Sequence, residues 1–273
     1  MQNSKLYQTL DISKYTVLVT GATAGIGRAI ALRFAELGCQ LVLIGRREER
    51  LQELSQEIAK LFPETPQPEN IKLDLSDVEA IKKLPEQLKN KNIDILVNNA
   101  GLALGVTGID NNNIEDSIKV VQTNLIAVIT LCSLFIPGMK ERKRGHVINI
   151  SSVAGQEAYE GGSVYCASKF AINGFSMAGR FDLAGTPVKV TTISPGLVET
   201  EFSQVRFKGD QEKAAKVYSD IAAMQAEDIA DQTIYAATRP ARVQIADIKA
   251  YCTNQPHAKY GIVRCGPEMQ QQQ

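Results

Sequence analysis

The sequence predicts an α/β fold built on one parallel β-sheet, with helices packed on both faces. Short β-branched runs alternate with amphipathic segments along most of the 273 residues. These runs are apolar throughout rather than alternately polar, which is typical of strands buried on both faces of a parallel sheet. The chain contains no internal repeat and no interdomain linker. Together these observations predict a single, doubly wound domain.

The expected elements follow one another in a regular strand–helix order. Strands are expected at residues 15–20, 40–45, 70–74, 93–97, 145–150, 188–194 and 244–251. Helices are expected at residues 25–37, 48–61, 117–139, 163–184, 210–222 and 227–238. Residues 62–70, with three prolines, are expected to form a surface loop. We assign residues 1–14 to an N-terminal extension and 15–273 to the domain, while the extension and segment 252–273 have no assigned role.

The overall charge argues against a protein that binds nucleic acid or a membrane surface. Thirty Lys and Arg residues balance thirty Asp and Glu residues. The most apolar window, residues 125–137, is too short to span a bilayer, and no secretion signal is expected at the start of the chain. Five cysteines without a C-x-x-C pair favour a reducing compartment. We therefore expect a cytoplasmic protein that acts on a small molecule.

Two classes of enzyme are excluded by their motifs. The chain has only two histidines, His146 and His257, and lacks the Cys and His spacing of a catalytic or structural zinc site. A serine hydrolase would need a G-x-S-x-G elbow, and Ser152 does not lie in one. No metal ion is therefore expected.

A glycine-rich stretch follows the first expected strand and opens the first expected helix. Glycine permits a tight turn that approaches a pyrophosphate, and the helix N-terminus adds free N–H groups. A simple strand-to-helix connection would use the same glycines, but the strand–turn–helix context favours a dinucleotide site on a Rossmann-type sheet. The expected cofactor-binding residues of this turn are Gly21, Thr23, Ala24, Gly25, Ile26 and Gly27.

The second expected strand ends at two arginines, Arg46 and Arg47. An NAD site usually has an acidic residue there, whereas guanidinium groups suit the 2′-phosphate of NADP. Cations at the start of a helix are disfavoured by its dipole, and a bound phosphate would compensate. The alternative is two solvated arginines. Asp74 is either an adenine contact or a helix cap, and Asn98 is expected beside the cofactor.

A tyrosine and a lysine one helical turn apart form the candidate catalytic pair. Tyr165 and Lys169 would share one face of the helix expected at 163–184. A free tyrosine has a pKa of about 10, and a nearby ammonium would stabilise its phenolate. Ser152 lies after the fifth expected strand, at the sheet edge where ligands bind. Its hydroxyl is expected to bond the substrate oxygen.

The ordered set of motifs resembles the short-chain dehydrogenase/reductase family over nearly the whole chain beyond Tyr15. The matching elements are TGATAGIG at 20–27, NNAG at 98–101, Asn124 in TNL, Ser152 in ISS, YCASK at 165–169 and PGLVET at 195–200. No single element is specific, but their order and spacing are. A non-catalytic relative would be expected to lose Ser152, Tyr165 or Lys169, and all three are present.

The resemblance implies a role for each matching residue. Tyr165 would exchange a proton with the substrate oxygen, which Ser152 would orient. Lys169 would lower the pKa of Tyr165 and hold the nicotinamide ribose, so Tyr165 and Lys169 also count as cofactor contacts. Asn124 would support a water linking Lys169 to solvent. The remaining implied cofactor contacts are Pro195, Gly196, Val198 and Thr200.

Three segments resemble a narrower group, the NADP-dependent 3-hydroxy acid dehydrogenases. They are GRREERLQEL at 45–54, NNAGLALG at 98–105 and the loop after Pro195. The resemblance implies serine, allo-threonine, 3-hydroxypropionate or malonic semialdehyde as substrate; the alternative is a broad carbonyl reductase for uncharged ketones. A substrate carboxylate requires a cation, for which Arg206 is the candidate. Phe202 and Val205 suggest a lid.

Pocket and interface residues are less defined by the pattern. Gln156 and Tyr159 are candidate pocket residues, although packing is the default interpretation of each, and Arg180 is expected at an interface. The family resemblance implies a homotetramer. Its candidate contact residues, not separable from core residues by sequence, are Phe170, Ile172, Phe175 and Leu183.

Overall fold

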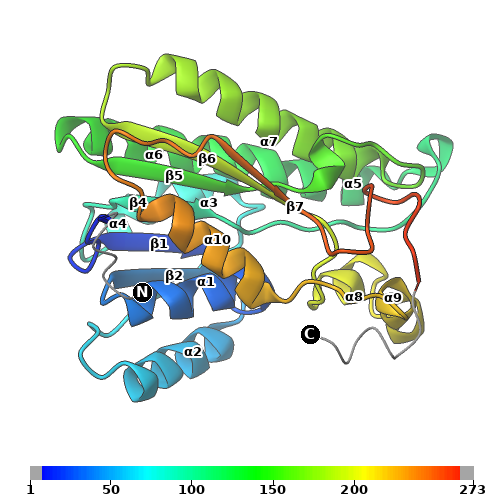
Figure 1. Ribbon diagram of the computed structural model, residues 1–273, viewed down its shortest axis with the longest axis horizontal. Helices are drawn as coiled ribbons and strands as arrows, with labels where there is room; N and C mark the ends of the chain where they lie inside the picture. The colour runs from blue at the N-terminus through cyan, green and yellow to red at the C-terminus, as the bar shows by residue number, and fades with distance from the viewer. Residues whose placement is uncertain (1–7, 265–273) are drawn as a thin grey trace.

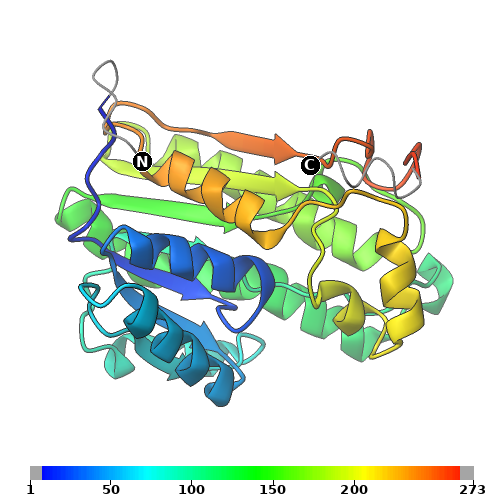
Figure 2. The same ribbon diagram turned by 60° about the horizontal axis from the view of Figure 1, so that its bottom comes forward.

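The computed structural model describes residues 8–264, which form a seven-stranded sheet between two layers of helices (Figure 1). All neighbouring strands are parallel, in the order β3-β2-β1-β4-β5-β6-β7. Helices α1, α2 and α10 cover one face, which Figure 2 brings forward, and α3, α6 and α7 cover the other. The predicted doubly wound fold is confirmed.

The strands lie close to their predicted positions. They are β1 (Thr16–Thr20), β2 (Gln40–Gly45), β3 (Glu69–Lys72), β4 (Ile95–Asn98), β5 (Gly145–Ile150), β6 (Val188–Pro195) and β7 (Asp247–Ala250). The largest difference is at β7, predicted at 244–251. The residues just before β7 already contact β6, but through hydrogen bonds that involve side chains. Val190 N–H donates to Gln244 Oε1, and Thr191 Oγ1 donates to Ile245 O.

The helices include several short ones that the sequence pattern does not predict. The longer helices are α1 (Gly25–Glu36), α2 (Glu48–Leu61), α5 (Ile114–Val121), α6 (Ala127–Glu141), α7 (Ser163–Asp182), α9 (Gln211–Tyr218) and α10 (Ala226–Ala237). The shorter ones are α3 (Val78–Lys82), α4 (Leu84–Gln87) and α8 (Phe202–Arg206). Each short helix has at most five residues, too few to show a periodic pattern.

The helix predicted at 117–139 runs from Ile114 to Glu141 and contains one π-helical turn, Gln122–Ile126. It begins earlier because the Asn113 side chain accepts from Asp116 N–H at 2.8 Å and caps the first turn. By length and composition this helix could cross a membrane. A core helix has the same composition, and Leu131, Phe135 and Met139 are buried against the sheet.

Each face of the sheet has its own apolar core. On one face, Phe34 and Ile30 of α1 and Ile234 of α10 pack with alternate residues of β1 and β2. On the other, residues of α6 pack with Leu18 of β1 and Leu96 of β4. Because β1 and β2 are buried on both faces, they carry no polar alternation, as predicted.

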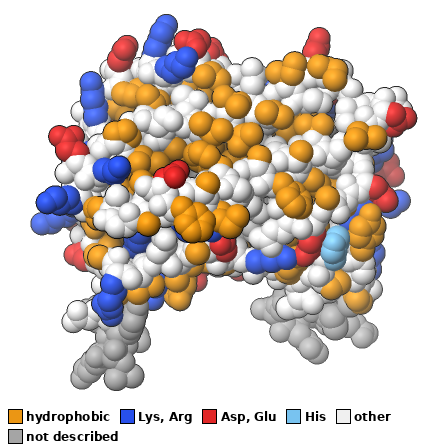
Figure 3. Space-filling model, turned by 90° about the horizontal axis from the view of Figure 1, so that it is seen from above, with side chains coloured by type: hydrophobic (Ala, Val, Ile, Leu, Met, Phe, Trp, Pro, Cys, Tyr) orange, Lys and Arg blue, Asp and Glu red, His pale blue; other side chains and the backbone are white. Residues whose placement is uncertain are grey.

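Only part of the predicted interface set is exposed. The sequence left interface and core open for these residues, and the structure places Ile172 and Leu183 in the core, with the partly buried Phe175 packed against it. Phe170 is exposed, together with other apolar residues of α5 and α7. The exposed set is Ile114, Ile118, Val121, Phe170, Met177 and Phe181. Figure 3 views the molecule from the α7 side and shows hydrophobic side chains gathered across that face.

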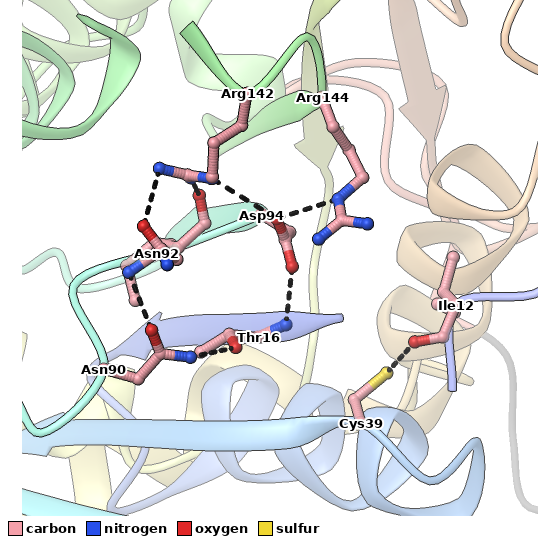
Figure 4. Close-up of polar contacts among 9 residues, drawn as sticks. Ile12, Thr16, Cys39, Asn90, Asn92, Asp94, Arg142 and Arg144 are labelled. Atoms are coloured by element: carbon pink, nitrogen blue, oxygen red, sulfur yellow. Dashed lines mark hydrogen bonds and ion pairs between the residues drawn. The ribbon is translucent and has the colours of Figure 1, made fainter. Parts of the chain in front are cut away.

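A buried carboxylate joins three strands at their amino ends (Figure 4). Asp94 is 2% exposed and accepts from Thr16 N–H at 3.0 Å and from Arg144 Nε at 2.9 Å. Arg142 Nε lies 4.0 Å from the same carboxylate and its Nη2 donates to Ile93 O. The network therefore holds β1, β4 and the turn before β5 at the edge opposite their carboxyl ends.

We predict that Asp94→Asn lowers the free energy of unfolding by about 2–3 kcal/mol, because the buried site loses a charge that pairs with two guanidinium groups. Chemical denaturation measures the change. Asp231→Asn is the control, since Asp231 pairs with Arg33 in an exposed position worth at most about 1 kcal/mol. Equal effects of the two substitutions would contradict this account of the Asp94 network.

Candidate active site

A cavity of about 630 Å³ opens at the carboxyl ends of β1, β4, β5 and β6. The predicted site residues that line it are Gly21, Thr23, Ala24, Gly25, Ile26, Arg46, Arg47, Asp74, Ser152, Tyr165, Lys169, Pro195, Gly196, Val198, Thr200 and Arg206. Helices α8 and α9 and the segment after β7 gather at this end of the sheet (Figures 1 and 2). The cavity thus brings together segments far apart in the sequence.

The glycine-rich turn forms a cradle at one end of the cavity. Gly21 and Gly25 have φ values of +66° and +51°, the region that favours glycine. A Cβ atom on Gly25 would lie 3.0 Å from the Thr200 side chain. Among the described residues, no side chain caps the N-terminus of α1. Its free N–H groups therefore border the cavity, an arrangement that suits a phosphate group.

Gly27 has a packing role behind this cradle. A Cβ atom there would lie 2.3 Å from both Gly21 O and Asn99 Nδ2. The predicted cofactor residue Gly27 therefore allows α1 to pack against the turn and does not itself line the cavity.

The two predicted arginines differ in their contacts. Arg47 Nη1 pairs with Glu201 at 2.9 Å, and its Nη2 donates to Thr23 Oγ1 at 3.2 Å. Arg47 therefore links the glycine-rich turn to the residue preceding α8. Arg46 lines the cavity near Asp74, and its charge helps to lower the pKa of that carboxyl group.

The contacts of Asp74 exclude one of its two sequence interpretations, the cap of helix α3, and leave the adenine contact as a prediction. Its Oδ1 accepts from Ser76 N–H at 2.9 Å and from Ser76 Oγ at 2.8 Å. Burial raises the pKa of Asp74, but these hydrogen bonds outweigh burial and the net shift is downward. The cap of α3 is Asp77, not Asp74. Asp74 therefore shapes the turn after β3 while still lining the cavity.

The asparagine that reaches the cavity is Asn99 rather than the predicted Asn98. Asn98 is buried and its Nδ2 donates to Asn149 Oδ1 at 2.8 Å, which ties β4 to β5. Asn99 Nδ2 donates to Thr20 O at 2.9 Å and lines the cavity. Side chains of successive residues in a strand point in opposite directions. The two adjacent asparagines therefore have different surroundings, and only Asn99 is placed to contact a bound cofactor.

Ser152, Tyr165 and Lys169 meet at the other end of the cavity. Lys169 Nζ donates to Ile150 O at 2.9 Å and lies 5.9 Å from the centroid of the Tyr165 ring. The Ser152 hydroxyl donates to Pro195 O at 3.4 Å and accepts from Ala154 N–H at 3.1 Å, and it is close enough to Tyr165 to lower the pKa of the phenol. The cluster predicted from three separate motifs is thus a single constellation.

Burial dominates the electrostatics of this cluster. It raises the pKa of Tyr165, and the nearby Tyr159 adds to the rise, whereas the Ser152 hydrogen bond and the positive charge of Arg206 oppose it. Burial also lowers the pKa of Lys169 to about 8. The sequence-based expectation named Lys169 as the cation that lowers the pKa of Tyr165. Arg206 also acts on Tyr165 in this direction, and the effect of Lys169, whose Nζ lies 5.9 Å from the ring centroid, stays a prediction.

Asn124 lies in the π-helical turn, behind the wall of the cavity. Its Oδ1 accepts from Leu102 N–H and its Nδ2 donates to Leu102 O, both at 2.9 Å. A Cβ atom on Gly101 would lie 3.4 Å from both Asn124 Oδ1 and Lys169 Nζ. Asn124 and Lys169 therefore border the same glycine. A π turn inside an α-helix is frequent at functional sites.

The loop after β6 adds a short helix, α8, above the cluster. Arg206 Nη1 donates to the Tyr159 hydroxyl at 3.0 Å, and Gly105 N–H donates to Arg206 O at 2.9 Å. The Phe202 ring centroid lies 5.6 Å from that of Tyr165. Arg180 Nη1 donates to Ala246 O at 3.1 Å, which places Arg180 beside β7, and its interface role stays a prediction.

The segment after β7 forms a wall that sequence reasoning left unassigned. Ala258, Lys259, Ile262 and Arg264 line the cavity. Glu157 holds this segment, since it accepts from Ala258 N–H at 2.8 Å and from Lys249 Nζ at 2.7 Å. Burial raises the pKa of Glu157, but its hydrogen bonds prevail and lower it to about 2. No sequence motif marks these long-range contacts.

The fold and the Ser152–Tyr165–Lys169 cluster are those of a short-chain dehydrogenase, and the chain belongs to that family. The family model described as short chain dehydrogenase matches residues 15–211. The chain is 44% identical over 254 residues to NADP-dependent 3-hydroxy acid dehydrogenase YdfG of Salmonella typhi, covering 91% of this chain and 99% of the relative.

Two further proteins extend the comparison. An NADP-dependent 3-hydroxy acid dehydrogenase of Schizosaccharomyces pombe is 37% identical over 248 residues, covering 90% of this chain and 95% of the relative. The closed form of serine dehydrogenase complexed with NADP+ is similar with a TM-score of 0.84 and 42% identity, covering 91% of this chain and 99% of that one.

We predict that Lys169 makes stability rise with pH. Its folded-state pKa of about 8 lies below the ordinary value of 10.5, so between these values the unfolded chain binds more protons. Compared with Lys169→Met, the native protein should gain about 3 kcal/mol of stability across that window. Denaturation of both proteins at several pH values measures this difference. Parallel stability curves would contradict the buried, easily deprotonated amine.

Proposed function

We propose that the protein is an NADP-dependent oxidoreductase that transfers a hydride between NADP(H) and the 3-hydroxyl or 3-oxo group of small 3-hydroxy acids. The observation that carries the proposal is a single cavity with a nucleotide cradle at one end and Ser152, Tyr165, Lys169 and Arg206 at the other. The similarity to NADP-dependent 3-hydroxy acid dehydrogenases over nine-tenths of the chain supports it.

The residues of the cradle fit NADP. The uncapped N-terminus of α1 and the glycine backbone suit the pyrophosphate, and Arg46 and Arg47 offer guanidinium groups for the 2′-phosphate. The remaining contacts are proposed for Thr23, Asp74, Asn99, Pro195, Gly196, Val198 and Thr200, with Tyr165 and Lys169 toward the ribose. When bound, NADPH supplies the hydride that reduces a carbonyl group.

Tyr165 is the proposed proton donor in the direction of reduction. Its raised pKa keeps the phenol protonated near neutral pH. As negative charge develops on the substrate oxygen, the phenol hydroxyl donates its proton to that oxygen, which the Ser152 hydroxyl orients. In the direction of oxidation the phenol must lose its proton, and the positive charge of Arg206 assists.

Lys169 and Asn124 are proposed to return the proton. An amine with a pKa of about 8 both holds and releases a proton near neutral pH. Asn124 borders the same glycine as Lys169, which suits a water that links the amine to solvent.

The exposed faces of α5 and α7 are the proposed surface for assembly into a homotetramer. Phe170, Met177 and Phe181 lie on one side of α7, at helical spacing, and are 44%, 54% and 78% exposed. An apolar patch of this kind marks an interaction surface. The helix at residues 114–141 is long and apolar enough to cross a membrane, but burial of its outer side in an interface would account for the same composition. We therefore further propose a soluble, cytoplasmic protein.

We predict NADP-dependent turnover of serine, allo-threonine and 3-hydroxypropionate, followed at 340 nm. Simple uncharged ketones and aldehydes with NADPH form the comparison set, and we expect kcat/KM at least about tenfold lower for them because Arg206 would lack its partner. Faster turnover of bulky uncharged ketones would favour a broad carbonyl reductase instead.

We predict that Tyr165→Phe abolishes turnover, because the proposed proton donor is lost. The variant should still bind NADPH, which calorimetry measures.

We predict that Arg46 and Arg47 affect cofactor choice differently. Arg46→Gln should reduce the NADPH preference over NADH by about tenfold, the value of one charged hydrogen bond. Arg47→Gln should have a smaller effect on this ratio, because Arg47 already pairs with Glu201. Titration of each variant with both cofactors measures the ratio. Equal losses would show that the 2′-phosphate displaces Glu201.

We predict that Met177→Asp combined with Phe181→Asp shifts the protein toward smaller species, because two charges would be buried in the proposed interface. Light scattering after size-exclusion chromatography measures the mass. Lys140→Asp, on the exposed end of α6, serves as the control. An unchanged assembly in the double variant would place the interface elsewhere.

A further inference from the structure

The ring of Tyr159 packs closely against the backbone of Gly162. It lies between β5 and α7, and a Cβ atom on Gly162 would approach its Cε2 to 2.4 Å. Gly162 immediately precedes the first residue of α7, the helix that carries Tyr165. The absence of a side chain at Gly162 therefore makes room for the Tyr159 ring next to the candidate catalytic residue.

The hydroxyl of Tyr159 is aligned with the guanidinium group of Arg206. It accepts from Arg206 Nη1 at 3.0 Å, and the guanidinium carbon lies 5.5 Å from the ring centroid. A hydroxyl that accepts a hydrogen bond keeps its own proton as a donor. Burial raises the pKa of Tyr159, so this proton is retained near neutral pH.

Arg206 also has an unused donor. Within the described part of the chain, its Nε is buried and has no hydrogen-bond partner. A buried, unpaired guanidinium N–H is unfavourable, and a ligand that accepts from it would remove the penalty. Arg206, Tyr159 and Tyr165 all line the same cavity. Two donors of different residues are thus available beside the proton donor.

We propose that Tyr159 and Arg206 together bind the carboxylate of the substrate. The Arg206 Nε–H and the Tyr159 O–H donate to its two oxygens, while the bond between the two side chains keeps the guanidinium group oriented. This inference rests on the proposed function, because it assigns a second binding residue to the same substrate. It makes Tyr159 a determinant of specificity: a neutral substrate would leave both donors unpaired.

The test compares an acid with its neutral ester. We would measure kcat/KM with NADP+ for 3-hydroxypropionate and for its methyl ester in the native protein and in Tyr159→Phe. Tyr159→Phe should lower kcat/KM for the acid by about ten- to a hundredfold, mainly through KM, since a hydrogen bond to a charged group is lost. The value for the ester should stay within about twofold.

A matched variant and a binding measurement complete the design. Tyr260→Phe removes an exposed hydroxyl that bonds Glu160 and should leave both substrates unaffected. Inhibition by propionate, which carries the carboxylate without the reacting hydroxyl, should weaken in Tyr159→Phe by the same factor as kcat/KM for the acid. This second measurement reports carboxylate binding alone, because propionate binds without reacting.

The outcomes separate the two proposals. A native protein that turns over the ester as well as the acid would overturn the proposed function. A native protein that prefers the acid, with that preference and propionate inhibition intact in Tyr159→Phe, would overturn only the role of Tyr159. An equal loss for acid and ester would also overturn it, because the ring would then serve packing alone.

Discussion

The reversal of strand order beside β1 is the constraint on which the site depends. From β1 the chain builds outward through β2 to β3, and it then returns to place β4 on the other side of β1. Connections on the two sides leave in opposite directions, so no crossover covers the carboxyl ends of β1 and β4. The cavity opens there, and the turns after these strands supply its floor.

The same arrangement explains the electrostatics of the candidate catalytic residues. Tyr165 and Lys169 project from α7 into a region bordered by Phe202 and by the segment after β7, where Lys169 is buried and Tyr165 is half-buried. Burial disfavours the charged form of each group, raising the pKa of the phenol and lowering that of the amine. The pKa values of the two groups therefore move apart: the phenol holds its proton more tightly and the amine releases its proton more readily. The short helix α8 brings Arg206 close enough to influence Tyr165, which connects the proposed substrate-binding residue with the proposed proton donor.

The local sequence pattern predicts the bounds of an element well where the element is a fully buried strand or a strongly amphipathic helix. The bounds of β2, α2 and β5 match their predicted ranges, because their apolar residues form uninterrupted runs or helical stripes. Motif order placed Ser152, Tyr165 and Lys169 correctly in one cavity. Contacts between distant segments were not predictable. Tyr159 and Arg206 are 47 residues apart.

The remaining differences have the same origin. The helix α8 is held by a backbone bond from the loop after β4 and not by its own periodicity. The choice of Asn99 over Asn98 depends on which side of the sheet edge each side chain faces. Burial in the folded chain, which a sequence motif does not report, sets the pKa of Tyr165 and Lys169.

Deuterium transfer tests the proposed reaction most directly. The protein would be incubated with malonic semialdehyde and with NADPH deuterated at nicotinamide C4, each of the two C4 diastereomers being used separately. We expect one diastereomer to place a single deuterium on the hydroxyl-bearing carbon of 3-hydroxypropionate, as measured by mass spectrometry. A product with no deuterium from either diastereomer, or one labelled at that carbon only from deuterated water, would contradict direct hydride transfer in this cavity.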